Sequence, residues 1–177
     1  MTVIVVTGPP GSGSSTVGKL VADKLGLDYF SPGKYLKEKV DGINESESAV
    51  KGWREGKMAD EDINRSIDDL QKQVAGQGNV VIEGKLSIYM VEDKADLTVW
   101  LNAPLSDRAE RTAERDDISV EEAKEHIKER QHEEVKNWRE MYDFNYLTQE
   151  KEADYVIDTS DITAEEVAEK IVSKIER

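Results

Sequence analysis

The N-terminal part of the chain changes from a continuous apolar run to a helical spacing of apolar positions. Residues 2–7 (TVIVVT) are β-branched throughout, which is typical of a strand buried on both faces of a parallel sheet. Apolar side chains then recur every three or four residues, as in an amphipathic helix, at Val17, Leu20, Val21 and Leu25. Gly26 is a stop signal for that helix, and residues 27–30 (LDYF) predict a second short strand.

Short apolar strands and amphipathic helices continue to alternate along the rest of the chain. Further strands are predicted within residues 76–84, 95–104 and 153–158. Helices are predicted over about 35–40, 45–56, 60–75, 104–115, 119–142 and 163–175. The last two begin with capping-box spacings, Ser119 with Glu122 and Thr163 with Glu166. Because strands alternating with helices are typical of a parallel sheet, the pattern predicts an α/β fold.

One stretch of the helix over 119–142 has no apolar face. Residues 128–134 (KERQHEE) are polar all round, whereas the residues before and after them have a good apolar spacing. A helix that is polar all round is usually surrounded by solvent. We therefore expect this helix to project into solvent or to break at residues 128–134.

The turn between the first strand and the first helix is rich in glycine (GPPGSGSST, 8–16). The phosphate-binding loop has the pattern G-x-x-x-x-G-K-[ST], and Gly8, Gly13 and Ser15 fit it, but Ser14 stands where the pattern has lysine. Amides of such a turn and of the following helix N-terminus bind phosphate oxygens. The predicted phosphate site consists of Gly8, Gly11, Ser12, Gly13, Ser14, Ser15 and Thr16. The alternative is a glycine-rich turn that holds no ligand.

A carboxylate ends the strand within residues 76–84. Glu83 follows the apolar run VVI, and in phosphate-loop enzymes an acid at such a strand end holds Mg²⁺. Ser15, at the Ser/Thr position of the loop, is the second expected Mg²⁺ ligand. The alternative is a solvated surface acid.

Arginines supply the positive charge that phosphoryl transfer needs. Arg108, Arg111 and Arg115 are spaced by three and four and share one helix face. We expect at least one of them to be functional, although a solvated face paired with nearby acids is the alternative. Arg130 and Arg139 lie on the long helix, where they can close over a substrate.

Composition narrows the classes of function. The chain has 177 residues, no cysteine and a net charge of −14. It therefore fits one domain, has no thiol chemistry, and repels nucleic-acid backbones. No segment approaches the roughly 20 apolar residues that cross a bilayer, and no secretion signal is evident, so we expect a cytoplasmic protein with no membrane or nucleic-acid partner.

Over nearly its whole length the sequence resembles the archaeal-type cytidylate kinases, which are nucleoside monophosphate kinases. The resemblance is carried by GPPGSGSST (8–16), SPGKYLKE (31–38), INRSIDDLQ (63–71), GNVVIEGKLS (78–87), ADLTVWLNAPLSDRAERTAERD (95–116), ISVEEAKEHIKERQ (118–131) and ADYVIDTS (153–160). It implies a P-loop NTPase fold with a five-stranded parallel sheet. It also implies that the protein is a monomer. The core would comprise residues 1–40, 76–117 and 151–177, with a nucleotide-monophosphate-binding segment at about 41–75 and a lid at about 116–142.

The resemblance also implies an activity and a set of roles. The family transfers the γ-phosphoryl group of ATP to CMP or dCMP and uses Mg²⁺. By resemblance, residues 8–16 hold the ATP phosphates, and Arg115 and Arg130 belong to the lid. The residues implied for the acceptor nucleotide are Ser31, Lys37, Arg65, Asp68 and Lys85.

Several positions depart from the family pattern, and they lie in the expected site. Ser14 replaces the lysine of the phosphate loop, and Lys34 stands where the family has an acid. Lys37 and Lys85 replace arginines, and Asn137 stands where an arginine is expected before Trp138.

Three accounts of these departures stay open. The first is a kinase of weak or altered activity in which Lys34 partly replaces the charge absent at Ser14, so that Lys34 joins Arg115, Arg130 and Arg139 as catalytic candidates. The second is a nucleotide-binding relative that no longer transfers phosphate. The third is a kinase of another small molecule on the same fold.

Overall fold

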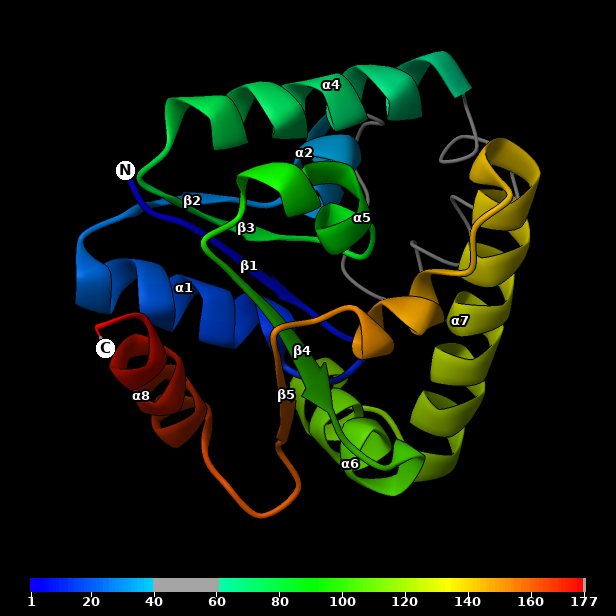
Figure 1. Cartoon of the computed structure of the whole chain (residues 1–177). Coiled ribbons are helices and arrows are strands. Elements are labelled where there is room, and N and C mark those ends of the chain that lie inside the picture. The colour runs from blue at the N-terminus through cyan, green and yellow to red at the C-terminus, as the bar shows by residue number, and fades with distance from the viewer. Residues whose placement is uncertain (40–60, 177) are drawn as a thin grey trace.

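One parallel sheet forms the centre of the computed structural model, which describes residues 1–39 and 61–176 (Figure 1). The strand order is β2-β3-β1-β4-β5, and every neighbouring pair is parallel. The strands are β1 Val3–Thr7, β2 Asp28–Phe30, β3 Val80–Glu83, β4 Leu97–Asn102 and β5 Tyr155–Asp158. The α/β class and all the predicted strands are therefore confirmed.

Helices connect successive strands, as a parallel sheet requires. The connecting helices are α1 Ser14–Leu25, α2 Pro32–Lys39, α4 Glu61–Gln77, α5 Ser87–Val91, α6 Leu105–Asp116 and α7 Val120–Tyr142, and α8 Ala164–Ile175 follows the last strand. Two short 3-10 helices, Glu92–Lys94 and Tyr146–Lys151, and the short α5 lacked a clear periodicity in the sequence and were not predicted. The helix predicted over 45–56 lies outside the described residues.

Alternate residues of β1 belong to two separate hydrophobic cores, one on each face of the sheet. Val3 and Val5 pack on the side of α4 and α5. Ile4 and Val6 pack on the opposite side, against α1 and α8. Figure 1 shows the same arrangement, with α4 and α5 above the sheet and α1 and α8 below it. Burial of β1 on both faces explains why its sequence is apolar without alternation.

The predicted helix ends are confirmed where local chemistry sets them. Gly26 follows α1 with a φ of 63°, a left-handed conformation that glycine adopts at little cost. Thr163 and Glu166 form both hydrogen bonds of a capping box before α8. Ser119 accepts a hydrogen bond from the backbone N–H of Glu122 at the start of α7.

The expectation that the long helix breaks at residues 128–134 is wrong, and projection into solvent holds only for its outer face, where Lys128 and His132 are exposed. Helix α7 runs unbroken from Val120 to Tyr142. Glu134 is only 2% exposed, and its carboxylate accepts a hydrogen bond from Arg130 Nε at 2.8 Å. Two side chains of this stretch, Arg130 and Glu134, line a pocket instead of facing solvent, and hydropathy alone does not distinguish these two environments.

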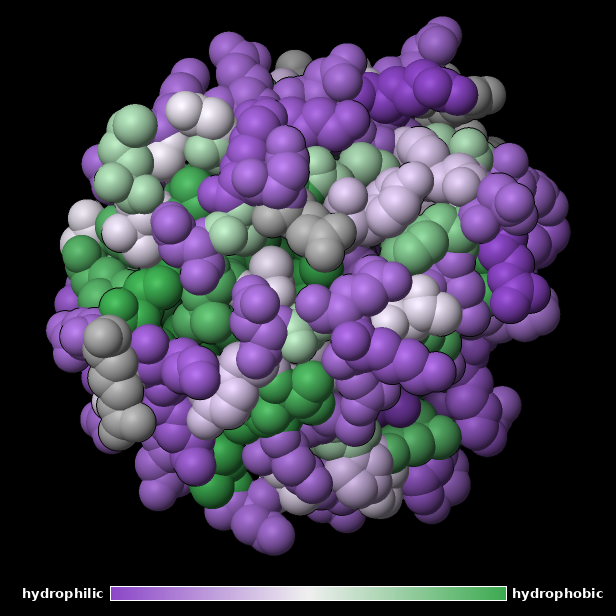
Figure 2. All heavy atoms as spheres, in the orientation of Figure 1, coloured by the Kyte–Doolittle hydropathy of each residue, from purple (hydrophilic) through white to green (hydrophobic). Residues whose placement is uncertain are grey.

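The surface is dominated by polar and charged side chains, as Figure 2 shows for one face. Hydrophobic side chains also reach that face, where the largest group lies on the left and others lie below the centre and to the right. This distribution agrees with a net charge of −14. Among the helices of residues 1–39 and 61–176, none is long and apolar enough to cross a membrane.

Candidate functional site

The phosphate loop joins β1 to α1 over residues 8–13. Gly11 and Gly13 have φ values of 81° and 90°, which only glycine adopts readily. Helix α1 begins at Ser14 with no side-chain hydrogen bond to its first amides. These amides and the positive end of the helix dipole are therefore available to an anion, which is the arrangement that binds phosphate.

Glu83 lies beside this loop, because β3 pairs with β1 and places Glu83 opposite Val6. The Glu83 carboxylate accepts hydrogen bonds from Ser14 Oγ at 2.8 Å, Ser31 Oγ at 3.0 Å and the Tyr29 hydroxyl at 3.3 Å. Burial, together with the negative charge of Glu83, raises the pKa of Tyr29, so this phenol stays a donor. Ser14, which occupies the lysine position, therefore orients a carboxylate.

The residues around Glu83 fit Mg²⁺. This ion is usually held by one or two carboxylates together with substrate phosphates and water, not by a cage of protein ligands. Within the described part of the chain no group of three or more His, Cys, Asp or Glu residues is placed to hold a metal ion. Glu83 and the exposed Ser15 on the first turn of α1 are oxygen ligands of the kind that Mg²⁺ prefers.

Lys85 lies on the turn after β3 and contacts the phosphate loop directly. Its Nζ donates a hydrogen bond to the carbonyl oxygen of Gly8 at 2.5 Å. The pKa of Lys85 is lowered to about 8, chiefly by burial and also by the positive charges of Arg130 and Arg108, although Glu134 and Glu83 oppose this change. An ammonium group is thus held among charged groups next to the first residue of the loop.

The three arginines of α6 have different partners although they share a helix face. Arg108 is buried and donates from Nη1 to the Pro10 carbonyl of the phosphate loop at 2.9 Å. Arg111 donates to Thr159 Oγ1 at 2.9 Å, and Arg115 forms a two-point ion pair with Asp116. Arg108 therefore supports the loop itself.

A hollow of about 380 Å³ lies along the outer side of the phosphate loop. Its walls come from the loop, α1, α6 and the segment between β5 and α8. Its polar lining residues are Ser12, Thr16, Arg111, Thr112, Arg115, Thr159 and Thr163. The hollow thus continues directly from the amides of the loop.

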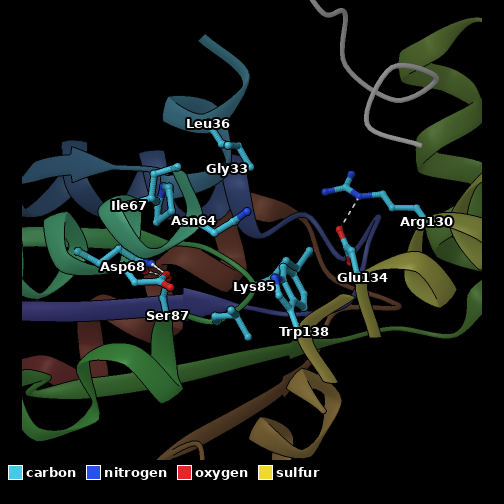
Figure 3. A pocket seen from close by; sticks show the side chains of 13 residues that line it. Gly33, Leu36, Asn64, Ile67, Asp68, Lys85, Ser87, Arg130, Glu134 and Trp138 are labelled. Carbon is cyan, nitrogen blue, oxygen red and sulfur yellow. Dashed lines mark hydrogen bonds and ion pairs between the residues drawn. The ribbon is translucent and has the colours of Figure 1, made fainter. Parts of the chain in front are cut away.

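A second pocket lies on the other side of the loop and is shown in Figure 3. Side chains from α2, α4, the turn after β3 and α7 enter it from different directions. The residues that line it are Pro32, Gly33, Leu36, Asn64, Ile67, Asp68, Gln71, Lys85, Leu86, Ser87, Arg130, Glu134 and Trp138. Because Lys85 lines this pocket and also bonds to Gly8, the pocket and the phosphate loop meet at its ammonium group.

A chain of hydrogen bonds fixes one wall of this pocket. Ser87 Oγ donates to Gln71 Oε1 at 2.8 Å, and Gln71 Nε2 donates to Asp68 Oδ1 at 3.1 Å. The hydroxyl of Tyr142, at the end of α7, donates to Asp68 Oδ2. Asp68 thus joins α4 to α7, and its burial raises the pKa of its carboxyl group.

The structure brings some of the predicted acceptor and catalytic residues together and leaves others apart. Four of them lie together: Ser31 donates a hydrogen bond to Glu83, and the pocket is lined by Asp68, Lys85 and Arg130. Lys34 and Arg65 are exposed, and Arg139 is exposed on the last turn of α7. The side chain of Lys37 lies outside the described residues.

Lys34 is not at the phosphate loop in this structure. Its ammonium pairs with Glu38 at 3.8 Å, one turn along α2, and its side chain is 68% exposed. Asn64 lines the pocket where its neighbour Arg65 was expected, because adjacent residues of a helix point in different directions. The spacing of four between Arg130 and Glu134 is the only sequence signal for the buried Glu134, and it is a weak one.

The buried Asp68 carboxylate predicts a pH-dependent cost in stability. Its pKa is raised above the ordinary 3.8 by burial, so stability falls as pH rises from about 4 through the folded-state pKa. We expect Asp68→Asn to raise Tm at pH 7 by about 2–4 °C, the shift that ~1 kcal/mol causes in a chain of this size. The difference should shrink as the pH falls towards 3.5, because wild-type Asp68 then becomes increasingly protonated in the unfolded state as well. Melting curves at pH 7 and pH 3.5 test this, and an unchanged or lower Tm at pH 7 would contradict it.

Comparison with known proteins gives a consistent result. Residues 3–161 match the model of the cytidylate kinase-like family. A cytidylate kinase from Ignicoccus hospitalis is 39% identical over 171 residues, which cover 97% of each chain. A cytidylate kinase from Methanocaldococcus jannaschii is 36% identical over 177 residues, covering 98% of this chain and 97% of its own.

Solved structures share the fold at lower identity. An uncharacterized protein from Eubacterium ventriosum has a TM-score of 0.76 at 15% identity, with 99% of each chain covered. A shikimate kinase from Bacteroides thetaiotaomicron has a TM-score of 0.66 at 19% identity, again over 99% of each chain. At such identities the likeness concerns the fold alone, and it confirms the predicted P-loop kinase fold.

Proposed function

Because the chain belongs to the cytidylate kinase-like family, we propose that it transfers the γ-phosphoryl group of ATP to CMP or dCMP with the help of Mg²⁺. The bond from the γ-phosphorus to the β–γ bridging oxygen breaks, and a phosphate oxygen of CMP forms the new bond, giving ADP and CDP. The observation that carries this proposal is the position of the phosphate loop between two hollows, one for each nucleotide.

The donor nucleotide fits the loop and the hollow along its outer side. The backbone N–H groups of residues 11–16 would bind the β- and γ-phosphates, and the hollow beyond them would take the nucleoside of ATP. Arg108 keeps the loop in this shape through its bond to Pro10. Bound Mg²⁺ would be held by Glu83 and Ser15, and it would neutralise charge on the phosphates.

The acceptor fits the pocket in Figure 3. Cytosine presents an amino donor next to a ring-nitrogen acceptor, and a carboxylate is the usual partner of that amino group. Asp68 supplies such a carboxylate, and the neighbouring Asn64 and Gln71 supply amides. Lys85 and Arg130, at the end of the pocket nearest the phosphate loop, would bind the acceptor phosphate and the transferred group.

The acceptor pocket must open to admit a nucleotide. The described residues enclose only about 80 Å³, less than the roughly 300–1,000 Å³ of typical small-molecule sites. The hydroxyl of Tyr142 already donates a hydrogen bond to the Asp68 carboxylate, and this bond links α7 to α4. We infer that the substrate amino group replaces Tyr142 at Asp68 as α7 moves away and then closes over the bound phosphates.

One assay distinguishes this function from its alternatives. ADP production is coupled to a detectable reaction with CMP, dCMP, UMP, AMP or shikimate as the acceptor. We expect CMP and dCMP to be preferred over UMP by about 10- to 100-fold in kcat/KM, because uracil presents a carbonyl oxygen to the Asp68 carboxylate. ATP binding without turnover would favour a nucleotide-binding protein that no longer transfers phosphate. Ser14, at the position of the phosphate-loop lysine, is the observation that favours this alternative. Turnover of a non-nucleotide acceptor alone would contradict the proposal.

A further inference from the structure

We propose that Lys85 supplies the ammonium group that the phosphate loop lacks at Ser14, so that its side chain contacts the β- and γ-phosphates of bound ATP. In the standard loop the lysine that reaches these phosphates is part of the helix after the second glycine. Here it would come from the turn after β3, on the opposite side of the loop. This inference rests on the proposed function, because it assigns a role in the same phosphoryl transfer.

Ser14 itself has a different task. Its side chain is buried, and its hydroxyl is bonded to Glu83 at 2.8 Å. It is also too short to extend over phosphates held by the loop amides. The charge must therefore come from another side chain, since phosphoryl transfer depends on positive charge around the moving group.

Two lysines near the site differ sharply in position. Lys34 pairs with Glu38 at the surface of α2. Lys85 Nζ lies 2.5 Å from the carbonyl oxygen of Gly8, the first residue of the phosphate loop. Of these two, only Lys85 brings its ammonium to the backbone that would hold the phosphates.

The bond to Gly8 is one that ATP can replace. A carbonyl oxygen is a neutral acceptor, whereas a phosphate oxygen carries negative charge, so Coulomb attraction to the ammonium adds to the hydrogen bond. An ammonium held at the loop by a neutral acceptor is therefore free to turn to a phosphate when ATP binds. Lys85 also follows Glu83 by two residues. The end of β3 would therefore place both the Mg²⁺ ligand and the ammonium group beside the bound phosphates.

Glu134 provides the matching negative charge. Its side chain is 2% exposed, one carboxylate oxygen is bonded to Arg130, and the other has no hydrogen-bond partner among the described residues. Glu134 is the largest favourable charge interaction of the Lys85 ammonium. A buried carboxylate on α7 thus keeps the ammonium positioned between the loop and the acceptor pocket.

The test is whether a lysine at position 14 can replace the lysine at position 85. We expect Lys85→Met to lower kcat by about 100- to 1,000-fold, the usual effect of removing one charged donor from a transition state. It should also weaken ATP binding in calorimetry more than ADP binding. The double variant S14K/K85M should recover most of both losses, and Lys94→Met, an exposed lysine of the 3-10 helix after α5, should behave as wild type.

The single variant S14K gives a second result without changing position 85. A site that already holds an ammonium should gain less than threefold in kcat from another one. A gain of about 100-fold or more would show that the wild-type site lacks this charge and would overturn the proposal.

Other outcomes separate the inference from the proposed function. If K85M raises only the KM for CMP and S14K/K85M recovers nothing, Lys85 serves the acceptor phosphate alone and the inference is wrong, whereas the kinase function stands. If the wild type binds ATP but phosphorylates no acceptor, the proposed function fails, and the calorimetric comparison of K85M with S14K/K85M still decides the role of Lys85. If the wild type binds no ATP, both fail.

Discussion

Replacing Glu83 with glutamine is expected to lower kcat for CMP phosphorylation by about 100- to 1,000-fold, while the protein keeps its fold. The Glu83 carboxylate lies beside the phosphate loop, and Ser14, Ser31 and Tyr29 all donate hydrogen bonds to it. Glutamine keeps the size of the side chain but removes the charge that would hold Mg²⁺ next to the phosphates. Initial rates over a range of Mg²⁺ concentrations measure this effect.

The Mg²⁺ dependence makes this prediction specific. E83Q should need a higher Mg²⁺ concentration for half-maximal rate, because one ligand of the ion has lost its charge. Glu169→Gln is a matched control, since Glu169 is an exposed acid that pairs with Lys24, at the end of α1 opposite to the phosphate loop. A variant E83Q with more than half of the wild-type rate at low Mg²⁺ would show that Glu83 has a structural role only.

Replacing Gly8 with alanine is expected to abolish measurable ATP binding and to lower the free energy of unfolding by about 1–3 kcal/mol. A Cβ at this position would lie 2.4 Å from the carbonyl oxygen of Leu101 and 2.6 Å from Ser12 Oγ. The Leu101 carbonyl belongs to β4, in the middle of the sheet, and cannot move away cheaply. The loop must therefore shift, and its amides lose the positions that bind phosphate.

Gly76→Ala is the control for this substitution. A Cβ at Gly76 would have no neighbour within 4 Å, and the residue lies within α4, where alanine is favoured over glycine by up to about 1 kcal/mol. We expect G76A to be as stable as wild type or more stable, with unchanged ATP binding. Urea unfolding and calorimetry on both variants measure the two effects. Wild-type ATP affinity in G8A would contradict the assignment of this loop.

The sheet and the phosphate loop could be predicted from the sequence because local patterns specify them. Residues 2–7 are apolar without alternation since β1 is buried on both faces. Gly11 and Gly13 are needed for a backbone with positive φ, and this requirement is visible in the sequence as glycine. Thr163 and Glu166 bond only to each other and to the backbone beside them, so their spacing was sufficient to predict the helix start.

The arrangement of the site depends on contacts that no local pattern specifies. The charge of Lys85 is bonded to Gly8, far along the chain, and the Lys34 side chain that was expected near the phosphates turns outward to Glu38. The polar stretch 128–134 was predicted to meet solvent, but its last residue, Glu134, is buried beside Arg130. Sequence spacing gives the face of a helix, whereas only the packed fold decides what that face meets.

The most direct test of the account is the binding of a bisubstrate compound in which a polyphosphate bridge joins adenosine to cytidine. The account predicts one such molecule bound per chain, more tightly than ATP or CMP alone, and displaced by either nucleotide, because the two hollows meet at the phosphate loop. Binding that only ATP displaces, or no binding at millimolar concentration with Mg²⁺, would contradict a site built for phosphoryl transfer between two nucleotides.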